Sequence, residues 1–207
     1  MVNREKVAAL LFDLGGVVID INFDLAFQAW ENKSKLSLEE MRSRFEIDTA
    51  YQQHERGEIK ATEYFKHLRQ KLEIEGNDED IRRGWNAIFI GEITQSLNYI
   101  RAAKNRLPCF AFTNSNPTHQ TQWETVFPQV TACFDRIFVS SELGLRKPDY
   151  AAFDAIAQAT GIDLSSMLFF DDALENIEGA LNAGLQAIHV RTPMDVKQAL
   201  VAIGVLA

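Results

Sequence analysis

The sequence is poor in cysteine, and this shortage excludes a disulfide-stapled scaffold. Its 207 residues contain two cysteines, Cys109 and Cys133. Both lie in apolar surroundings and lack the spacing of a metal site, so we expect buried free thiols. Such scarcity fits a reducing compartment.

Basic residues and long apolar runs are also in short supply. There are 21 Lys and Arg against 29 Asp and Glu, a formal net charge of -8, so nucleic acid and membrane are not expected as partners. The first apolar run is too short for a signal peptide or a membrane span, which makes a cytoplasmic location the expectation. A hydrophobic content of 46% suits a soluble globular protein with a sizeable core.

The first apolar run ends in a single carboxylate and two glycines. Residues 7–18 read Val-Ala-Ala-Leu-Leu-Phe-Asp-Leu-Gly-Gly-Val-Val, which is typical of a buried parallel strand that opens into a loop. Asp13 would then lie at the carboxyl end of the strand, where open α/β sheets bind their ligands. Gly15 and Gly16 allow a sharp turn and a close backbone approach to a ligand.

After this strand the hydrophobic spacing becomes helical. Between residues 24 and 99 apolar residues such as Trp30, Met41, Leu68 and Trp85 recur at helical spacing, and no strand is predicted there. Ser37 before Leu-Glu-Glu is typical of a helix N-cap. We therefore predict a helical subdomain, residues 20–90, inserted after the first strand.

The second half of the chain alternates strands with helices. Strands are predicted at 108–112, 136–139, 167–170 and 187–190, and a closing helix at 196–207. This alternation predicts an α/β fold, a doubly wound parallel sheet built from residues 1–19 and 91–207. Right-handed crossovers would bring every carboxyl end to one edge of the sheet.

Polar side chains follow each predicted strand of the second half. Thr113 and Asn114 can donate hydrogen bonds to an anionic oxygen. Lys147 precedes Pro148, which is predicted at the first position of a helix, so its backbone is held outside that helix. An ammonium fixed there would neutralise charge on a phosphoryl group.

Two adjacent carboxylates, Asp171 and Asp172, end the strand that reads Met-Leu-Phe-Phe. They repel each other unless a cation stabilises them. Oxygen ligands without a supporting His or Cys favour a hard cation, chiefly Mg²⁺.

The four strand ends together resemble the haloacid dehalogenase-like hydrolase superfamily. Its ordered motifs match Asp13, Thr113, Lys147 and the Asp171-Asp172 pair over essentially the whole chain, with the insertion in the place of a small helical cap on a Rossmann-like core. The Arg-Lys-Pro, Phe-Phe-Asp-Asp and Asn-Ile-Glu-Gly-Ala runs are similar to those of bacterial sugar phosphatases, including one that acts on α-D-glucose 1-phosphate.

The resemblance implies a phosphatase that works through an aspartyl-phosphate on Asp13. Mg²⁺ would be held by Asp13, the Gly15 carbonyl and the Asp171-Asp172 pair. Either carboxylate of the pair can be the direct ligand, and we favour Asp172, with Asp171 acting through water and Lys147. Thr113, Lys147 and the Asn114 region, with Gly15 and Gly16, would hold the phosphate. The substrate would be a small phosphate ester, a sugar phosphate.

Position 15 departs from the superfamily. Most of its phosphatases carry a second aspartate there, which acts as general acid and base, whereas this chain has Gly15. The leaving group then needs little protonation, or an acid comes from Asp20, Asp24, His54 or Glu55, or catalysis is lost and a phosphate-binding protein remains. A 2-haloacid dehalogenase is a further alternative, although a carbon-halogen site has little use for a divalent cation.

The resemblance also implies that cap residues choose the substrate. His54 and Arg56 lie in the polar run 52–58, which is too hydrophilic for a core, and we expect this run to be a loop facing the active site. Phe23 and Trp85 are further candidates. The oligomeric state stays open, with a homo-oligomer as one alternative.

Overall fold

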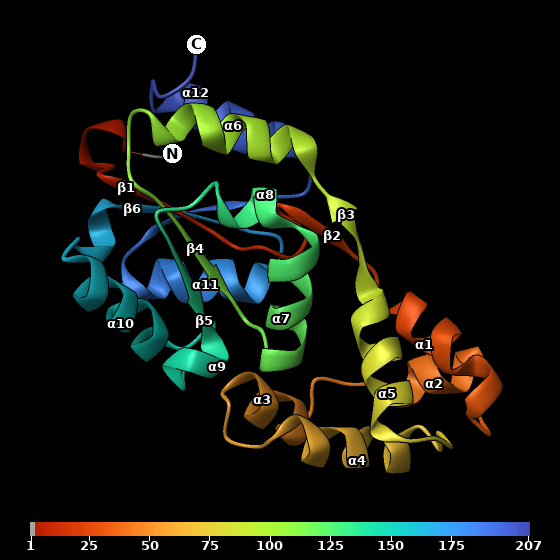
Figure 1. Ribbon diagram of the computed structural model, residues 1–207. Helices are drawn as coiled ribbons and strands as arrows, with labels where there is room; N and C mark the ends of the chain where they lie inside the picture. The colour runs from red at the N-terminus through yellow and green to blue at the C-terminus, as the bar shows by residue number, and fades with distance from the viewer. Residues whose placement is uncertain (1–2) are drawn as a thin grey trace.

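The computed structural model describes residues 3–207, and its centre is a parallel five-stranded sheet in the order β5-β4-β1-β6-β7 (Figure 1). The strands are β1 Ala9–Phe12, β4 Cys109–Thr113, β5 Arg136–Val139, β6 Met167–Asp171 and β7 Gln186–His189. Because β1 is central, the strand order reverses beside it, and this switch point is where open α/β sheets bind ligands. The predicted doubly wound sheet is confirmed.

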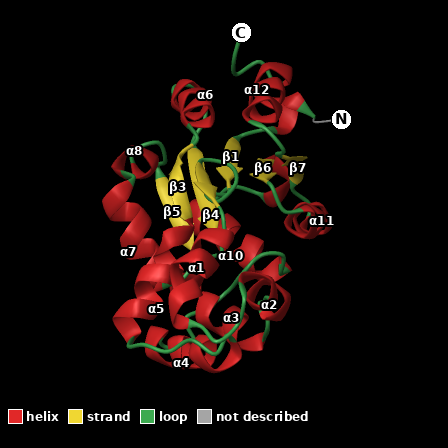
Figure 2. Cartoon of the chain, turned by 90° about the vertical axis from the view of Figure 1, so that its right-hand side faces the viewer, coloured by secondary structure: helices red, strands yellow, loops and turns green. Residues whose placement is uncertain are grey.

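Helices cover both faces of the sheet, because β1 buries alternate residues in opposite layers. Leu10 and Phe12 join one core cluster, and Ala9 and Leu11 join the other. The first layer contains α6 Thr94–Lys104, α7 Pro117–Val126, α8 Pro128–Thr131 and α12 Pro193–Ala202. The second contains α10 Tyr150–Thr160 and α11 Leu174–Ala183 (Figure 2). Short helical turns are η1 Arg4–Lys6, α9 Ser140–Leu143 and η4 Leu164–Ser166.

Two predicted helix boundaries in this half are wrong. The closing helix begins earlier than expected, at Pro193, because Thr192 and Asp195 form a capping box at its start. It ends at Ala202. Pro148 lies in a turn, and α10 begins two residues later at Tyr150. Both cysteines are buried and free, as expected.

The segment after β1 forms a helical insertion with its own core. Its elements are α1 Asp24–Trp30, η2 Glu31–Lys33, α2 Leu38–Arg44, α3 Thr49–Glu55, α4 Ala61–Lys71, α5 Asp78–Trp85 and η3 Asn86–Ile88. Ser37 caps α2 as predicted. Trp30, Tyr64 and Trp85 are almost fully buried in a cluster formed by this segment, which explains its helical spacing.

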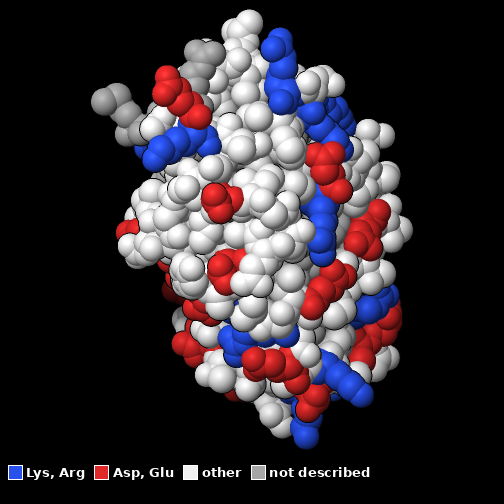
Figure 3. All heavy atoms as spheres, turned by 90° about the vertical axis from the view of Figure 1, so that its left-hand side faces the viewer, with Lys and Arg blue, Asp and Glu red and all other residues white. Residues whose placement is uncertain are grey.

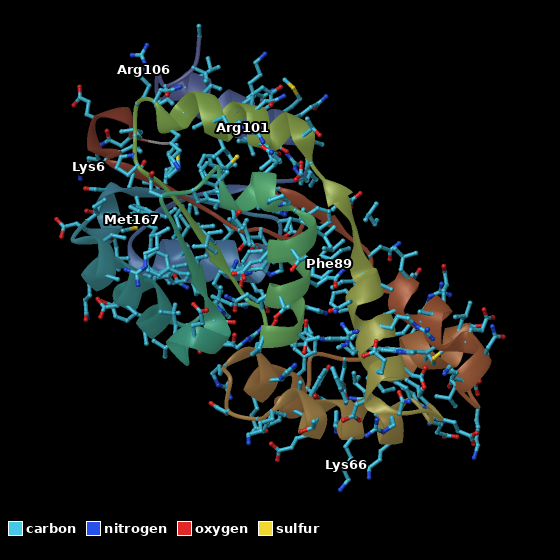
Figure 4. All side chains as sticks on the ribbon, viewed as in Figure 1. Lys6, Lys66, Phe89, Arg101, Arg106 and Met167 are labelled. Carbon is cyan, nitrogen blue, oxygen red and sulfur yellow. The ribbon has the colours of Figure 1, made fainter. Side chains whose placement is uncertain are left out.

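The prediction of no strand between residues 24 and 99 is wrong. Phe89–Glu92 forms β3, which pairs antiparallel with β2 Ile19–Ile21. The pairing joins residues far apart in the chain, so no local pattern signals it. This two-stranded ribbon connects insertion and core, and Phe89 lies at the junction (Figure 4).

The surface carries charges of both signs. On the face shown in Figure 3, acidic and basic side chains are interspersed and no continuous basic field is visible. Within residues 3–207, we find no helix with the length and apolar character needed to cross a membrane.

Candidate active site

Lys147 is the centre of the strand-end cluster. Its side chain is fully buried, and Nζ lies 3.0 Å from Asp13 Oδ1, 2.7 Å from Asp171 Oδ2 and 2.9 Å from the Phe112 carbonyl. These acceptors satisfy the three N–H donors of an ammonium group. Burial alone would lower the pKa of Lys147, but Asp13 and Asp171 outweigh it and raise the pKa, so the side chain stays charged.

Asp13 is placed by β1 and held by its neighbours. Its backbone N–H donates to the Phe170 carbonyl at 2.8 Å, and its Oδ1 accepts from the Leu14 N–H at 2.6 Å. The residue is 9% exposed. Burial raises the pKa of Asp13 to about 7, with Lys147 opposing the shift and the two neighbouring carboxylates adding to it.

The adjacent carboxylates Asp171 and Asp172 differ in their surroundings. Asp171 is fully buried, and its oxygens accept from Lys147, from the Asn176 amide and from the Ala173 N–H. Asp172 is exposed on the same strand end, and partial burial together with the charge of Asp171 raises its pKa. Asp172 therefore keeps free ligand capacity, whereas the oxygens of Asp171 are already in use.

The cluster fits a hard divalent cation. One carboxylate oxygen each from Asp13, Asp171 and Asp172 lies within 4.8 Å of the others. One ammonium cannot neutralise three carboxylates, and an all-oxygen donor set suits Mg²⁺. Gly16 passes so close to Asp172, at a φ of 68°, that a Cβ there would overlap the Asp172 carboxylate.

Thr113 is the last residue of β4, which pairs with β1, and Asn114 follows it. The side-chain amide of Asn114 donates to the Lys147 carbonyl at 3.0 Å and accepts from the Lys147 N–H at 2.9 Å. This reciprocal pair holds the backbone of Lys147 in place. Thr113 and Gly15 line a cavity of about 90 Å³ between the strand ends and the insertion.

The walls of this cavity are mostly apolar. Its lining residues are Leu14, Gly15, Ile19, Ile21, Phe23, Tyr51, Ile88, Phe89, Thr113, Asn114, Ser115, His119 and Trp123. The insertion and its connecting ribbon supply six of these residues, namely Ile19, Ile21, Phe23, Tyr51, Ile88 and Phe89. The cavity thus adjoins the carboxylate cluster and is closed by the insertion.

His54 and Arg56 do not line the cavity. The polar run that contains them is the end of α3 and the turn after it, not a loop as predicted. His54 is 1% exposed and stacks on Tyr64, with ring centroids 4.7 Å apart. Arg56 forms an ion pair with Glu58.

Glu55, in the same run, forms a buried contact between insertion and core that the sequence did not reveal. Its Oε2 accepts from Arg146 Nε at 2.9 Å, and its backbone carbonyl accepts from the hydroxyl of Ser140 at 2.6 Å. Ser140 directly follows β5, so the strand-end argument that selected Thr113 also applies to it. Arg146 immediately precedes Lys147.

His119 on α7 makes a second such contact. Its Nε2 lies 3.0 Å from the Trp85 carbonyl of the insertion, and the two rings stack at 4.6 Å. Burial lowers the pKa of His119 to about 3. The imidazole is therefore neutral at pH 7 and donates from Nε2.

The other residues considered as acids also lie away from the cavity. Asp20 is exposed on β2, and Asp24 forms an exposed ion pair with Arg42. Among the residues described, neither they nor His54 and Glu55 belong to the lining.

Taken together, the fold and the site define an α/β protein of the hydrolase type, in which a carboxylate at the central strand end faces a lysine and two further carboxylates. A family model described as haloacid dehalogenase-like hydrolase matches residues 7–184, and the chain belongs to this family.

Named relatives cover almost the whole chain. The chain is 24% identical over 199 residues to a D-ribitol-5-phosphate phosphatase of Bacteroides thetaiotaomicron, covering 94% of this chain and 97% of that protein. It is 27% identical over 191 residues to a phosphatase of Mycobacterium tuberculosis, covering 88% and 86%.

Solved structures share the fold. A haloacid dehalogenase family enzyme of Bacteroides thetaiotaomicron, crystallised with magnesium and inorganic phosphate, has a TM-score of 0.76 and 24% identity, covering 87% of this chain and 92% of that one.

Proposed function

We propose that the protein is a Mg²⁺-dependent phosphatase that hydrolyses a small phosphorylated metabolite, a sugar phosphate, through an aspartyl-phosphate intermediate. The observation that carries the proposal is the fully buried ammonium of Lys147 between Asp13 and Asp171, with Asp172 alongside. Three carboxylates around one ammonium at the switch point favour a divalent cation, and a cation held there would in turn attract a phosphoryl group. The relative that acts on D-ribitol 5-phosphate supports a sugar-type substrate.

Asp13 would act as the nucleophile. Its carboxylate attacks phosphorus in line and the bond to the leaving oxygen breaks, after which water releases phosphate and restores the carboxylate. The ammonium of Lys147 lies beside the reacting carboxylate, where its charge would stabilise the equatorial phosphoryl oxygens in the transition state. Thr113 and the backbone around Asn114, Gly15 and Gly16 complete the phosphate site.

Asp13, Asp172 and the Gly15 carbonyl would hold Mg²⁺ directly, with Asp171 acting through water and Lys147. When bound, the ion neutralises phosphate charge and so lets an anionic nucleophile approach. Asn176 and Ala173 keep Asp171 in the orientation that holds Lys147.

The insertion, residues 20–90, would be the cap that chooses the substrate, over a core of residues 1–19 and 91–207. Closure of the cap excludes water and strengthens the electrostatic interactions inside the site. His54 and Arg56, at the end of α3 and in the turn after it, would be the substrate-binding residues of this cap. We further propose that the protein is cytoplasmic and that it is either a monomer or a homo-oligomer.

A phosphate-binding protein without turnover is the second candidate. It is favoured by Gly15, which leaves the site without the aspartate that serves as general acid in most phosphatases of the superfamily. General acid-base catalysis typically contributes about 10²–10⁴ in rate.

The test is phosphate release across a panel of sugar, nucleotide and acyl phosphates, with Mg²⁺ or with a chelator. We expect metal-dependent turnover that is abolished by Asp13→Asn and retained by Asp20→Asn, a matched change of an exposed carboxylate. Absence of turnover on every compound, with phosphate binding still measurable by calorimetry, would favour the second candidate.

A further inference from the structure

The space beside Gly15 is filled by a hydrocarbon side chain. A Cβ built on Gly15 would lie 3.0 Å from Ile21 Cδ1 and 3.8 Å from Ile21 Cγ1. The loop is closed by the Gly16 N–H, which donates to the Ile19 carbonyl at 2.9 Å, so β2 carries Ile21 back over Gly15. Gly15 is not among the residues with positive φ. The backbone of Gly15 therefore tolerates a side chain, and within the described residues it is Ile21 that occupies the space such a side chain would need.

The leaving group must enter the cavity beside these two residues. In-line displacement places the departing oxygen on the side of phosphorus opposite Asp13. The cavity is lined by Gly15, Ile21 and Thr113, together with residues of the insertion. Its volume of about 90 Å³ favours a small leaving group.

Among residues 3–207, the lining of the cavity offers no effective proton donor to that oxygen at neutral pH. Its lining contains two titratable side chains, Tyr51 and His119. Burial, with the charge of Glu55 adding to it, raises the pKa of Tyr51 well above its usual value. Burial also keeps His119 neutral, because it lowers the pKa to about 3, and its Nε2 faces the Trp85 carbonyl.

We propose that Gly15 and Ile21 restrict this enzyme to small phosphoryl compounds whose leaving group departs as a stable anion, with carboxylic-phosphoric anhydrides and phenyl-type esters as the preferred classes. The inference rests on the proposed phosphatase function and narrows its substrate class. Among sugar phosphates it favours a phosphate on the more acidic anomeric oxygen over the phosphate of a primary alcohol, the kind of substrate named for the relative that acts on D-ribitol 5-phosphate. Phosphates of ordinary primary alcohols are disfavoured, because an alkoxide would have to leave into an apolar cavity without a proton.

The bond changes balance without an acid. The Asp13 carboxylate forms a bond to phosphorus, and the electron pair of the broken P–O bond stays on the leaving oxygen. A carboxylate or phenolate departs as the anion and takes any proton from bulk water. Water then attacks the aspartyl-phosphate, the carboxylate of Asp13 leaves, and the proton passes to the released phosphate.

The test measures kcat/KM for aryl phosphates whose phenols span about three pKa units, beside acetyl phosphate. Without a general acid, substantial negative charge develops on the leaving oxygen, so we expect kcat/KM to fall about 30-fold or more as the phenol pKa rises across the series. A rate that is independent of phenol pKa would overturn the inference and leave the phosphatase function intact. No release of phosphate even from the most activated ester or from acetyl phosphate would overturn the phosphatase function itself.

Matched variants test the assignment to Gly15 and Ile21. The double variant Gly15→Asp with Ile21→Ala supplies an acid and the space for its side chain. It should raise turnover of the least activated ester about tenfold or more and so make kcat/KM less dependent on the pKa of the phenol. The double variant Gly15→Asn with Ile21→Ala places a side chain of the same shape there but without a transferable proton. In this variant, and in Ile21→Ala alone, kcat/KM should depend on the pKa of the phenol as steeply as in the unaltered protein. If kcat/KM depends equally steeply on phenol pKa in the Gly15→Asp and Gly15→Asn double variants, the role given to Gly15 and Ile21 is overturned. A steeper dependence in Tyr51→Phe than in the unaltered protein would also overturn it, because Tyr51 would then be the donor of a proton to the leaving oxygen. Should the double variants not fold, the slope of the unaltered protein still decides the inference.

Discussion

Disrupting the ion pair between Glu55 and Arg146 should strongly destabilise the contact between insertion and core. The side chains of Arg146 and Glu55 are only 10% and 7% exposed, and Nε lies 2.9 Å from Oε2. Removal of one partner of a buried pair leaves an uncompensated charge and costs about 3–5 kcal/mol. Burial already raises the pKa of Glu55 against the opposing charge of Arg146, so Arg146→Met should make Glu55 take up a proton.

The magnitude is best obtained from a double-mutant cycle. Glu55→Gln and Arg146→Met should each lower the free energy of unfolding by about 3 kcal/mol, whereas the double variant should lose clearly less than the sum. We therefore expect a coupling energy of about 2 kcal/mol or more. Urea unfolding followed by tryptophan fluorescence measures it, because Trp30 and Trp85 report on the insertion and Trp123 on the core.

An exposed ion pair provides the matched control. Arg42 and Asp24 form a hydrogen-bonded pair whose side chains are 44% and 41% exposed. Exposed pairs contribute about 0–1 kcal/mol, so the same cycle on Arg42→Met and Asp24→Asn should give a small coupling energy. Equal coupling energies for the two pairs, or additive effects at Glu55 and Arg146, would refute the reasoning.

Three further predictions concern pH and packing. Because the pKa of His119 is about 3 in the folded chain against 6.5 as its ordinary value, the unfolded chain binds more protons between these pH values, so stability should fall as pH drops through 6.5. The contribution reaches about 1.4 kcal/mol at one pH unit below 6.5, and urea titrations at several pH values should show a smaller loss in His119→Gln. Gly84→Ala should lower stability by about 1–3 kcal/mol in urea titrations, despite better helix propensity, because its Cβ would overlap the Trp30 indole; an unchanged midpoint would contradict this packing. Gly16→Ala should weaken Mg²⁺ binding in calorimetry, because the left-handed φ and the overlap with Asp172 force the loop to shift; unchanged affinity would exclude Asp172 from that site.

The strand ends could be predicted because their signals are local. Asp13, Thr113 and Asp171 each end or follow a buried apolar run, and Lys147 is marked by the proline that follows it. Parallel connections then bring them to one edge whatever the details of packing. The same logic would have selected Ser140, which follows β5 and bonds the insertion.

The insertion could be predicted as helical, but not its orientation over the core. Helical spacing says which residues are apolar and does not say which face meets another domain. His54 and Glu55 are polar in sequence yet buried, because α3 packs between the insertion's own core and the strand ends. Strand β3 was missed because its pairing with β2 satisfies backbone groups that are distant in the chain.

The sequence by itself determined the parallel α/β sheet and the set of carboxylates and lysine at its edge, because each depends on a short apolar run and the polar residue after it. Only the tertiary structure decided how the insertion closes that edge. Arg146 and Glu55 are 91 residues apart in the chain, and Ile21 reaches Gly15 through a loop whose course the β2–β3 pairing sets. Contacts of this kind arise from packing between particular side chains of distant segments. Periodicity along the chain does not specify which distant side chains meet.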